Sequence, residues 1–457
     1  MTNTYYDTDF RNLDTPNAEF PSINTSHRNI KYNFYNSLYS GDYGKDKKLV
    51  IMTDNGKKQR ELPYKQISTN YFKLMINKIE SIVFSNDYVI STGNKENDRI
   101  IRDLFERTCV YDAIRQGIKN ICAYGDNVYR VNRHGINALL PINAYKVVDK
   151  HDKNRVKAYV LYEYLYDDTT FSTETVVAIR VEIHSAGRIY ERVYRSSGST
   201  LIEPIEYEYR GRTIKEDGNV YYTGVDISTV TWASINNDAD GIYGESLFED
   251  IKDLVFAYEQ LLTTSVYVAR SDANPLLVTG MSFIQTNEET GEYTLKIVDG
   301  DVILASGDDA KPEYLKKSDS ISNISKINDE ILGQIYAMSE MSKVLLSGEF
   351  GSNLSYDTLD LALKSIIDKC ERIINSAWTS IRDALYVLCR LNGVDINRED
   401  LNIKFNVGRA VSAQDRYKQF NEATKDGAVS KRTARIEILG MSDDEADNEA
   451  DIIKKEA

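Results

Sequence analysis

The sequence predicts an α+β protein, because two kinds of periodicity occupy different parts of the chain. Between residues 157 and 195 apolar residues alternate with polar ones at period two, which indicates an antiparallel meander with turns at Asp167-Asp168 and Ala186-Gly187. After residue 244, apolar residues recur in steps of three and four, as in amphipathic helices. These helical patterns cover residues 244–273, 320–343 and 357–391.

The first 243 residues mix further helices with the meander. Residues 1–27 are rich in Asn, Thr and Asp, and we expect an exposed arm. Helical patterns follow, and the break at Gly125-Asp126 leads into a strand. The helical patterns cover residues 30–40, 68–84, 97–105 and 111–123, and the strand begins at residue 127.

Between the first two long helices lies an insert that reads as short strands. Pro275 prevents continuation of the first helix. A sheet this small has little core, so we expect it to gain stability from neighbouring subunits. Its expected strands cover residues 276–284, 293–298 and 302–304. After the third helix, we expect a strand at residues 401–405 and two or three short helices, with capping boxes beginning at Ser412 and Ser442.

Composition excludes several classes of protein. The net charge of −14 argues against tight general binding of nucleic acid. The four cysteines, Cys109, Cys122, Cys370 and Cys389, show no CxxC spacing and are expected to be reduced, with Cys370 and Cys389 buried in a helix. The N-terminus is not a signal peptide, and no apolar run is long enough to span a membrane.

No motif for catalysis, cofactor binding or metal binding is present: GxxxxGK[ST], GxGxxG and HExxH are all missing. The four histidines are scattered, and His184, on an alternating strand, is expected to face solvent. Asp126 has two interpretations, a metal-binding catalytic carboxylate or a structural turn, and the turn is favoured. The acidic run at residues 443–451 is interpreted as a solvated helix rather than a cation site.

Two segments near the long helices have capping or connecting roles. Glu245 and Ser246 are expected to cap the first long helix. Residues 347–356 interrupt the helical register with Gly348 and Gly351, which fits either an ordinary connection or a functional loop projecting from rigid helices.

Five short phrases, in this order, resemble the portal proteins of tailed double-stranded DNA bacteriophages, most of all those of long-tailed phages that infect Gram-positive hosts. The resemblance covers roughly residues 28–450. The phrases are YNSLYSGD at 35–42, NYFKLMINKI at 70–79 leading to Val83-Phe84, AYGDNVY at 123–129, Leu140-Pro141, and GESLF at 244–248.

The resemblance implies a portal fold and a division of the chain into its parts. After an N-terminal arm (1–27) come an α/β wing (28–243), a first stem helix (244–273), a β-rich clip (274–319) and a second stem helix (320–343). A tunnel loop (344–356), a long wing helix (357–391) and a short helical crown (392–457) complete it. The crown is shorter than the family pattern.

The resemblance also implies a function without catalysis: a ring, normally of twelve subunits, at the unique capsid vertex, through which DNA is packaged and ejected. Implied partners are other copies of the chain, the large terminase subunit, head-completion or adaptor proteins, major capsid and scaffold proteins, and double-stranded DNA passing through without sequence specificity, with no membrane. The implied location is the virion, after assembly in the host cytoplasm.

Two groups of site residues follow from the resemblance. The channel-facing tunnel loop would comprise Ser347, Gly348, Glu349, Phe350, Gly351, Ser352 and Asn353. Clip contacts to other subunits or partners would comprise Leu276, Val278, Phe283, Tyr293, Leu295 and Ile297. Two alternatives stay open: another ring-forming component of a phage or phage-derived tail particle, and a metal-dependent nucleotide enzyme built on Asp126 and the acidic tail.

Overall fold

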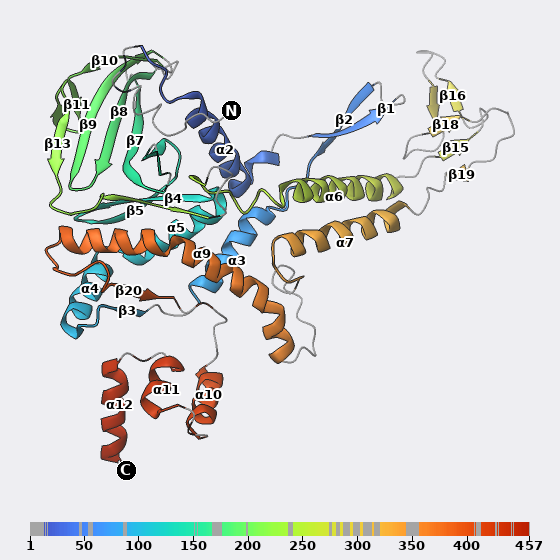
Figure 1. Ribbon diagram of the computed structural model, residues 1–457. Helices are drawn as coiled ribbons and strands as arrows, with labels where there is room; N and C mark the ends of the chain where they lie inside the picture. Colours follow the sequence, from blue (N-terminus) through green and yellow to red (C-terminus); the bar gives the residue numbers. More distant parts are fainter. Residues whose placement is uncertain are drawn as a thin grey trace. The chain divides into compact units, whose positions relative to one another are not determined.

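The protein divides by contacts into two compact units in the computed structural model (Figure 1). Unit 1 comprises residues 1–32, 76–246 and 363–457, and unit 2 comprises residues 33–75 and 247–362. The structure mixes helices and sheets, which confirms the predicted α+β class. It describes residues 13, 15, 17–44, 48–53, 58–85, 89–149, 151–152, 154–166, 176–197, 200–235, 241–273, 277–279, 284–286, 293–295, 302–304, 313–314, 320–343, 356–405, 407, 413–425, 427, 429–439, 441 and 443–456.

The largest sheet of unit 1 is the predicted meander, with its strands side by side in Figure 1. Its strand order is β10-β9-β8-β7-β6, and β13 additionally pairs with β9. Every pairing in the sheet is antiparallel. The predicted turn at Ala186-Gly187 joins β8 to β9, whereas Asp167-Asp168 lie outside the described residues. The strands are β6 Ala144–Val148, β7 Val156–Tyr166, β8 Val176–Ser185, β9 Arg188–Ser197, β10 Thr200–Ile205 and β13 Asn219–Tyr222.

Part of the predicted exposed arm instead belongs to the core, and that prediction is wrong. Phe20 is fully buried, and its ring meets the edge of Tyr162 at 5.2 Å between centroids. Leu13 is buried in the same cluster, and Leu201 donates its amide to Ala18. The polar composition of the segment concealed this one aromatic side chain, which is large enough to anchor the chain to the sheet.

A second sheet in unit 1, β14-β4-β5, packs against α5. The approach is close: a Cβ at Gly117 on α5 would lie 1.9 Å from the Tyr129 hydroxyl on β4, so only glycine fits. The predicted strand at 401–405 is present as β20, paired with β3. These elements are β3 Val89–Ser91, α4 Lys95–Arg107, α5 Val110–Tyr124, β4 Asp126–Asn132, β5 Gly135–Leu139, β11 Tyr207–Tyr209, β12 Arg212–Ile214, β14 Val230–Ser234 and β20 Asn402–Lys404.

The longest helix, α9 (Tyr356–Leu391), spans 36 residues, about 54 Å at 1.5 Å per residue. Its buried residues recur in steps of three and four, including Ile366, Cys370, Ile373, Ala377, Ile381 and Leu388. Ser380 on this helix accepts the hydroxyl of Thr231 from β14 at 3.0 Å through its carbonyl. Three short helices follow: α10 Ala413–Lys425, α11 Lys431–Glu437 and α12 Asp443–Glu456, the last carrying the acidic run.

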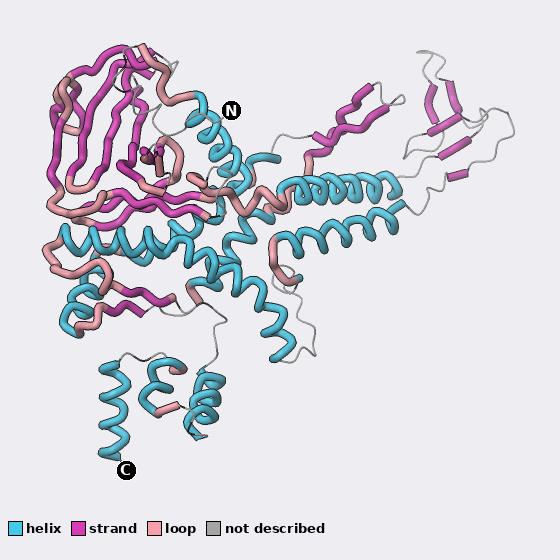
Figure 2. Tube along the Cα trace, in the orientation of Figure 1, coloured by secondary structure: helices cyan, strands magenta, loops and turns pink. Residues whose placement is uncertain are grey.

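In unit 2, helices α6 (Lys252–Ala273) and α7 (Ser320–Met338) lie side by side (Figure 2). Both are shorter than predicted, since α6 starts eight residues after 244 and residues 247–251 form turns. Helices α2 (Ile23–Ser40), α3 (Tyr71–Val83) and α9 each run from one unit into the other along the chain.

Short strands occupy both the predicted insert and a place where none was predicted. In the insert, β15 Leu277–Thr279 pairs in parallel with β18 Val302–Leu304 and antiparallel with β19 Glu313–Tyr314, while β16 Ile284–Thr286 pairs with β17 Tyr293–Leu295. The unpredicted hairpin joins β1 Lys48–Thr53 and β2 Lys58–Lys65, preceded by a 3-10 turn, η1 Asp42–Gly44. Pro63 and four charged residues make the sequence of β2 untypical of a strand.

Candidate functional site

A segment of unit 2 is fastened along helix α6 by the buried carboxylate of Glu259. Its Oε1 accepts three hydrogen bonds, from the Thr69 amide (2.6 Å), the Thr69 hydroxyl (2.9 Å) and the Tyr43 hydroxyl (2.7 Å). One turn later, the Thr263 hydroxyl accepts the Ile67 amide at 2.9 Å. Burial raises the pKa of Tyr43, which therefore stays protonated and donates. Residues 66–70 are thus positioned against α6 through their backbone.

The α6–α7 pair leaves apolar side chains uncovered. A hydrogen bond from Asn328 to Ser265 (3.5 Å) links the two helices. Val266 is 37% exposed, Ile327 45% and Met338 51%. Large apolar side chains exposed on a helix pair are typical of surfaces that contact another protein.

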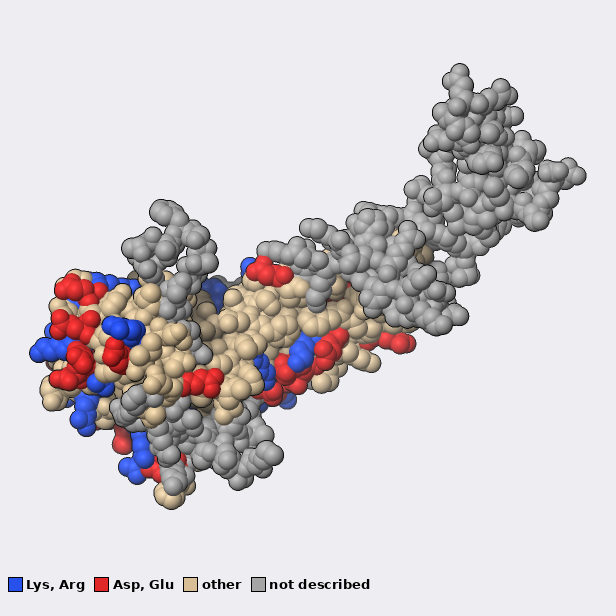
Figure 3. Space-filling model, turned by 90° about the horizontal axis from the view of Figure 1, so that it is seen from above, with Lys and Arg blue, Asp and Glu red and all other residues tan. Residues whose placement is uncertain are grey.

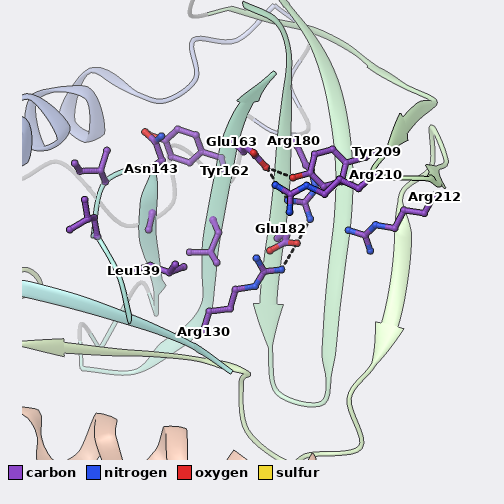
Figure 4. Close-up of a pocket in the computed structure, with 14 residues that line it drawn as sticks. Arg130, Leu139, Asn143, Tyr162, Glu163, Arg180, Glu182, Tyr209, Arg210 and Arg212 are labelled. Carbon is purple, nitrogen blue, oxygen red and sulfur yellow. Dashed lines mark hydrogen bonds and ion pairs between the residues drawn. The ribbon is translucent and has the colours of Figure 1, made fainter. Parts of the chain in front are cut away.

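In unit 1, a pocket of about 660 Å³ opens on the large sheet (Figure 4). Figure 4 shows Leu139 and Asn143 on one side and Arg180, Tyr209 and Arg212 on the other. The lining residues are Arg130, Leu139, Leu140, Ile142, Asn143, Ala144, Leu161, Tyr162, Glu163, Arg180, Glu182, Tyr209, Arg210 and Arg212.

A buried ionic network forms the floor of this pocket. Arg180 contacts Glu182 and Glu191, with its Nε donating to Glu191 at 2.6 Å. Arg130 binds Glu182 at 2.8 Å from one side, and Arg212 binds Glu191 at 2.6 Å from the other. Because each buried carboxylate has two arginine partners, the network is satisfied internally, which a buried charge requires.

His184 extends this network, so the prediction that it faces solvent is wrong. Its side chain is 1% exposed, with Nδ1 2.8 Å from the Thr229 hydroxyl and Nε2 3.3 Å from Glu182. Burial lowers the pKa of His184, which favours the neutral ring. Thr229 then donates to Nδ1, and Nε2–H donates to Glu182. The strand alternation was correct, but β8 lies inside the sheet and both of its faces are covered here.

Burial alone would raise the pKa of Glu182. The hydrogen bond from His184 and the charges of Arg130 and Arg180 outweigh burial and lower this pKa to about 2. The carboxylate is therefore ionised throughout the physiological range.

Asp126 is a structural residue at the turn between α5 and β4. Its two oxygens accept from the Tyr32 hydroxyl (2.7 Å), Trp232 Nε1 (2.7 Å), the Ser234 hydroxyl (2.5 Å) and the Gly244 amide (2.9 Å). The side chain is fully buried. With four donors and no exposure, it has no free lone pair directed at solvent for a metal or substrate, so its geometry gives the enzyme interpretation no support.

Glu245 and Ser246, which were predicted to cap the first long helix, belong to this turn region. The Ser246 hydroxyl donates to the carbonyl of Ala123 at 2.6 Å, and Glu245 pairs with Lys31 at 3.5 Å. Because α6 begins only at Lys252, neither residue caps it, and the capping prediction is wrong.

The comparison with known families decides the identity of the chain. The family model described as "Phage portal protein, SPP1 Gp6-like" matches residues 24–457. The chain belongs to this family of phage portal proteins. It is thus a structural protein of the virion, and the resemblance of the sequence to phage portal proteins is confirmed.

Solved structures of gene transfer agent (GTA) particles are also similar to this portal protein. A chain of the "virion of native gene transfer agent (GTA) particle" matches at 13% identity and TM-score 0.39, and one of the "neck of empty GTA particle computed with C6 symmetry" at 13% and 0.41. A chain of the "neck of native GTA particle computed with C12 symmetry" matches at 11% and 0.40. Each match covers 80% of this chain and 89% of the other. No curated protein matches in sequence.

The predicted portal sites fall largely outside the described residues. This holds for the whole tunnel loop, Ser347 to Asn353, and for Leu276, Phe283 and Ile297 of the clip. Of the other clip residues, Val278 lies on β15, while Tyr293 and Leu295 lie on β17 in a separate sheet.

The thiols of the portal protein follow the prediction. Cys370 and Cys389 are buried, and burial raises the pKa of each to about 12, so both are inert thiols. In the described part of the chain, no three His, Cys, Asp or Glu side chains are grouped as metal ligands. Nor does any helix described there combine the length and apolarity needed to cross a bilayer.

Sequence reasoning missed the charged pocket altogether. Its arginines and glutamates come from strands far apart in the chain, so no local motif marks them. One signal was available: Arg180, Glu182 and His184 occupy alternate positions of β8, which places three polar side chains on one face of a central strand.

Proposed function

We propose that this portal protein forms a ring, with twelve subunits as the expected number, around a channel for DNA at the unique capsid vertex. The observation that carries the proposal is the family match over residues 24–457. The element order supports it: two adjacent helices flank a β-rich insert, and a 36-residue helix follows. DNA would enter through the ring during packaging and leave through it during ejection.

Each part of the chain would form the part of the portal that the resemblance implies. Residues 28–243 with α9 would form the wing, α6 and α7 the stem, residues 274–319 the clip, 344–356 the tunnel loop and 392–457 the crown. One refinement comes from the contact division, which groups residues 33–75 with the stem and clip rather than with the wing. The hydrogen bonds to Glu259 give this grouping a physical basis.

The uncovered side chains of the stem support contact with neighbouring subunits. Val266, Ile327 and Met338 would be buried against adjacent copies in head-to-tail contacts that close by rotation. The edge strands of the insert sheets would pair with neighbours in the same way.

The charge of the chain supports passage of DNA rather than adhesion. The net charge is −14. On the face drawn in Figure 3, the coloured Lys and Arg side chains lie among Asp and Glu side chains rather than in one broad basic field. Acidic surfaces repel phosphate, so DNA could slide in either direction.

The remaining partners follow from the same proposal. The clip would dock the large terminase subunit, whose ATP hydrolysis drives packaging, and later the head-completion or adaptor proteins. Major capsid and scaffold proteins would surround the ring during assembly in the host cytoplasm.

Negative-stain electron microscopy with mass determination tests the ring directly. We expect rings of about twelve subunits with a central hole. A purified protein that forms compact dimers, in the presence of scaffold as well as alone, would contradict the proposal.

The tunnel loop has its own test. Shortening the segment 347–356 should leave rings intact but reduce DNA packaging or retention, measured as genome content per particle. A matched control shortens residues 54–57, between β1 and β2. Normal genome content in the loop variant would exclude the proposed role of the loop.

A further inference from the structure

The pocket on the large sheet of unit 1 is asymmetric, and this asymmetry points to a ligand. The pocket is lined by Leu139, Leu140, Ile142, Ala144 and Leu161, which we call the apolar wall, with Asn143 on the same side as Leu139 (Figure 4). Its arginine wall comprises Arg130, Arg180, Arg210 and Arg212 beside Glu163 and Glu182, and Arg180 and Arg212 lie opposite Leu139 in Figure 4. Even when Glu191 behind the wall is counted, arginines outnumber carboxylates, although the whole chain carries a charge of −14.

The surplus positive charge resides on Arg210. Its guanidinium lies 5.0 Å from the centroid of the Tyr209 ring, and it forms no ion pair with a carboxylate among the described residues. Arg210 and Gly211 form the two-residue turn between β11 and β12 with φ angles of 50° and 76°. Two positive φ angles characterise a tight hairpin turn, so the backbone holds this arginine at the rim of the pocket.

The neighbouring groups show which chemistry the arginine wall accepts. The hydroxyl of Tyr209 donates to Glu163 at 2.7 Å, and Arg180 contacts three carboxylates, those of Glu163, Glu182 and Glu191. Planar guanidinium groups bind carboxylates with two parallel donors. A carboxylate supplied from outside would meet the same geometry at Arg210.

The apolar wall decides between a simple anion and a peptide. Inorganic phosphate gains no binding energy from contact with leucine side chains. Leu140 is 39% exposed, so an apolar side chain of a bound peptide can contact it. A volume of about 660 Å³ accommodates several residues of an extended chain. We propose that this pocket binds a peptide segment of a partner protein in which Asp or Glu lies next to a bulky apolar residue.

Arg210 would bind the carboxylate, and the Leu140 wall would take the apolar side chain. This proposal does not depend on ring formation, because every lining residue belongs to unit 1 of one chain.

Peptide display tests the proposal on the full-length protein. Random heptapeptides are selected on the wild-type chain and counter-selected on Arg210→Glu. We expect enrichment of sequences with Asp or Glu within two residues of Leu, Ile, Val or Phe. The proposal is overturned if no sequence survives counter-selection, or if the survivors lack an acidic residue.

Fluorescence anisotropy of one enriched, labelled peptide then measures how much each wall contributes to the affinity. Arg210→Glu and Leu140→Asp should each weaken binding by about tenfold or more, and Arg210→Lys by less, because lysine lacks the planar fork. Arg188→Glu is the matched control: it reverses an exposed charge on the same sheet outside this pocket and should leave affinity unchanged. Thermal unfolding of each variant confirms folding.

Inorganic phosphate serves as the competing probe. If phosphate alone displaces the peptide and Leu140→Asp does not change affinity, the pocket is a simple anion site and the peptide proposal fails.

Discussion

The two units of the chain differ in the interactions that hold their described residues together. In unit 1, the large sheet, the Asp126 turn and the Arg180 network are buried and satisfied within one subunit. In unit 2, a core of aromatic rings around Phe72 and Phe248 supports a helix pair that exposes Ile327 and Met338. Unit 1 therefore satisfies its buried charges within one chain, although it also exposes apolar side chains such as Ile30 (64%) and Tyr222 (84%). The exposed apolar side chains of unit 2 include those of its helix pair, which neighbours in the proposed ring would cover.

The largest effect is expected at the turn of unit 1. Asp126→Ala leaves four donors without an acceptor in a fully buried site. We expect a loss of about 3–5 kcal/mol in the free energy of unfolding, measured with urea at pH 7. Asp217→Ala, in an exposed loop, is the control and should change it little. A loss below about 1 kcal/mol would show that the turn does not hold unit 1 together.

The second largest effect is expected at low pH, where the free energy of unfolding of unit 1 should fall. The pKa of Glu182 is about 2 in the folded protein against 4.5 ordinarily, so the unfolded chain binds more protons between those values. The stabilisation is complete above about pH 5 and is lost as pH falls towards 2, by up to roughly 3 kcal/mol. His184, whose pKa is lowered, acts in the same direction at higher pH.

Both tryptophans, Trp232 and Trp378, lie in unit 1, so their fluorescence reports its unfolding as a function of pH. Glu182→Gln should flatten the loss between pH 5 and 3. Equal slopes for wild type and variant would show that other carboxylates govern the acid response. Over the same pH range, the protection of the α6 amides in unit 2 against hydrogen exchange should change less.

A smaller and local effect is expected in unit 2. Glu259→Ala removes the acceptor for Thr69 and Tyr43, and we expect residues 66–70 to detach from α6 at a cost of about 2 kcal/mol. Hydrogen exchange should accelerate at the amides of Ile67 and Thr69 while unit 1 is unaffected. Glu259→Gln, which retains the Oε1 acceptor, is the control. Unchanged exchange in the alanine variant would argue against this attachment.

The sequence predicted elements with strong periodicity and missed contacts between distant residues. The long helix at 357–391 and the meander at 157–195 were visible because many residues share one period. The β1–β2 hairpin was missed because β2 contains Pro63 and four charged residues, and Phe20 because a single buried aromatic makes no pattern. His184 and the arginine pocket required knowledge of which strands lie beside β8, and no local spacing contains this information.

The smallest effect on the free subunit is expected at the exposed face of the stem helices. Ile327 is 45% exposed, so Ile327→Asp should change the free energy of unfolding of the monomer by less than about 0.5 kcal/mol. In a ring, the same aspartate would be desolvated against a neighbour, and assembly should fail. Lys326→Asp, at an exposed neighbouring position, is the control and should still assemble. Mass measurement distinguishes rings from monomers, and intact rings of Ile327→Asp would mean that this face of unit 2 meets solvent in the assembled portal.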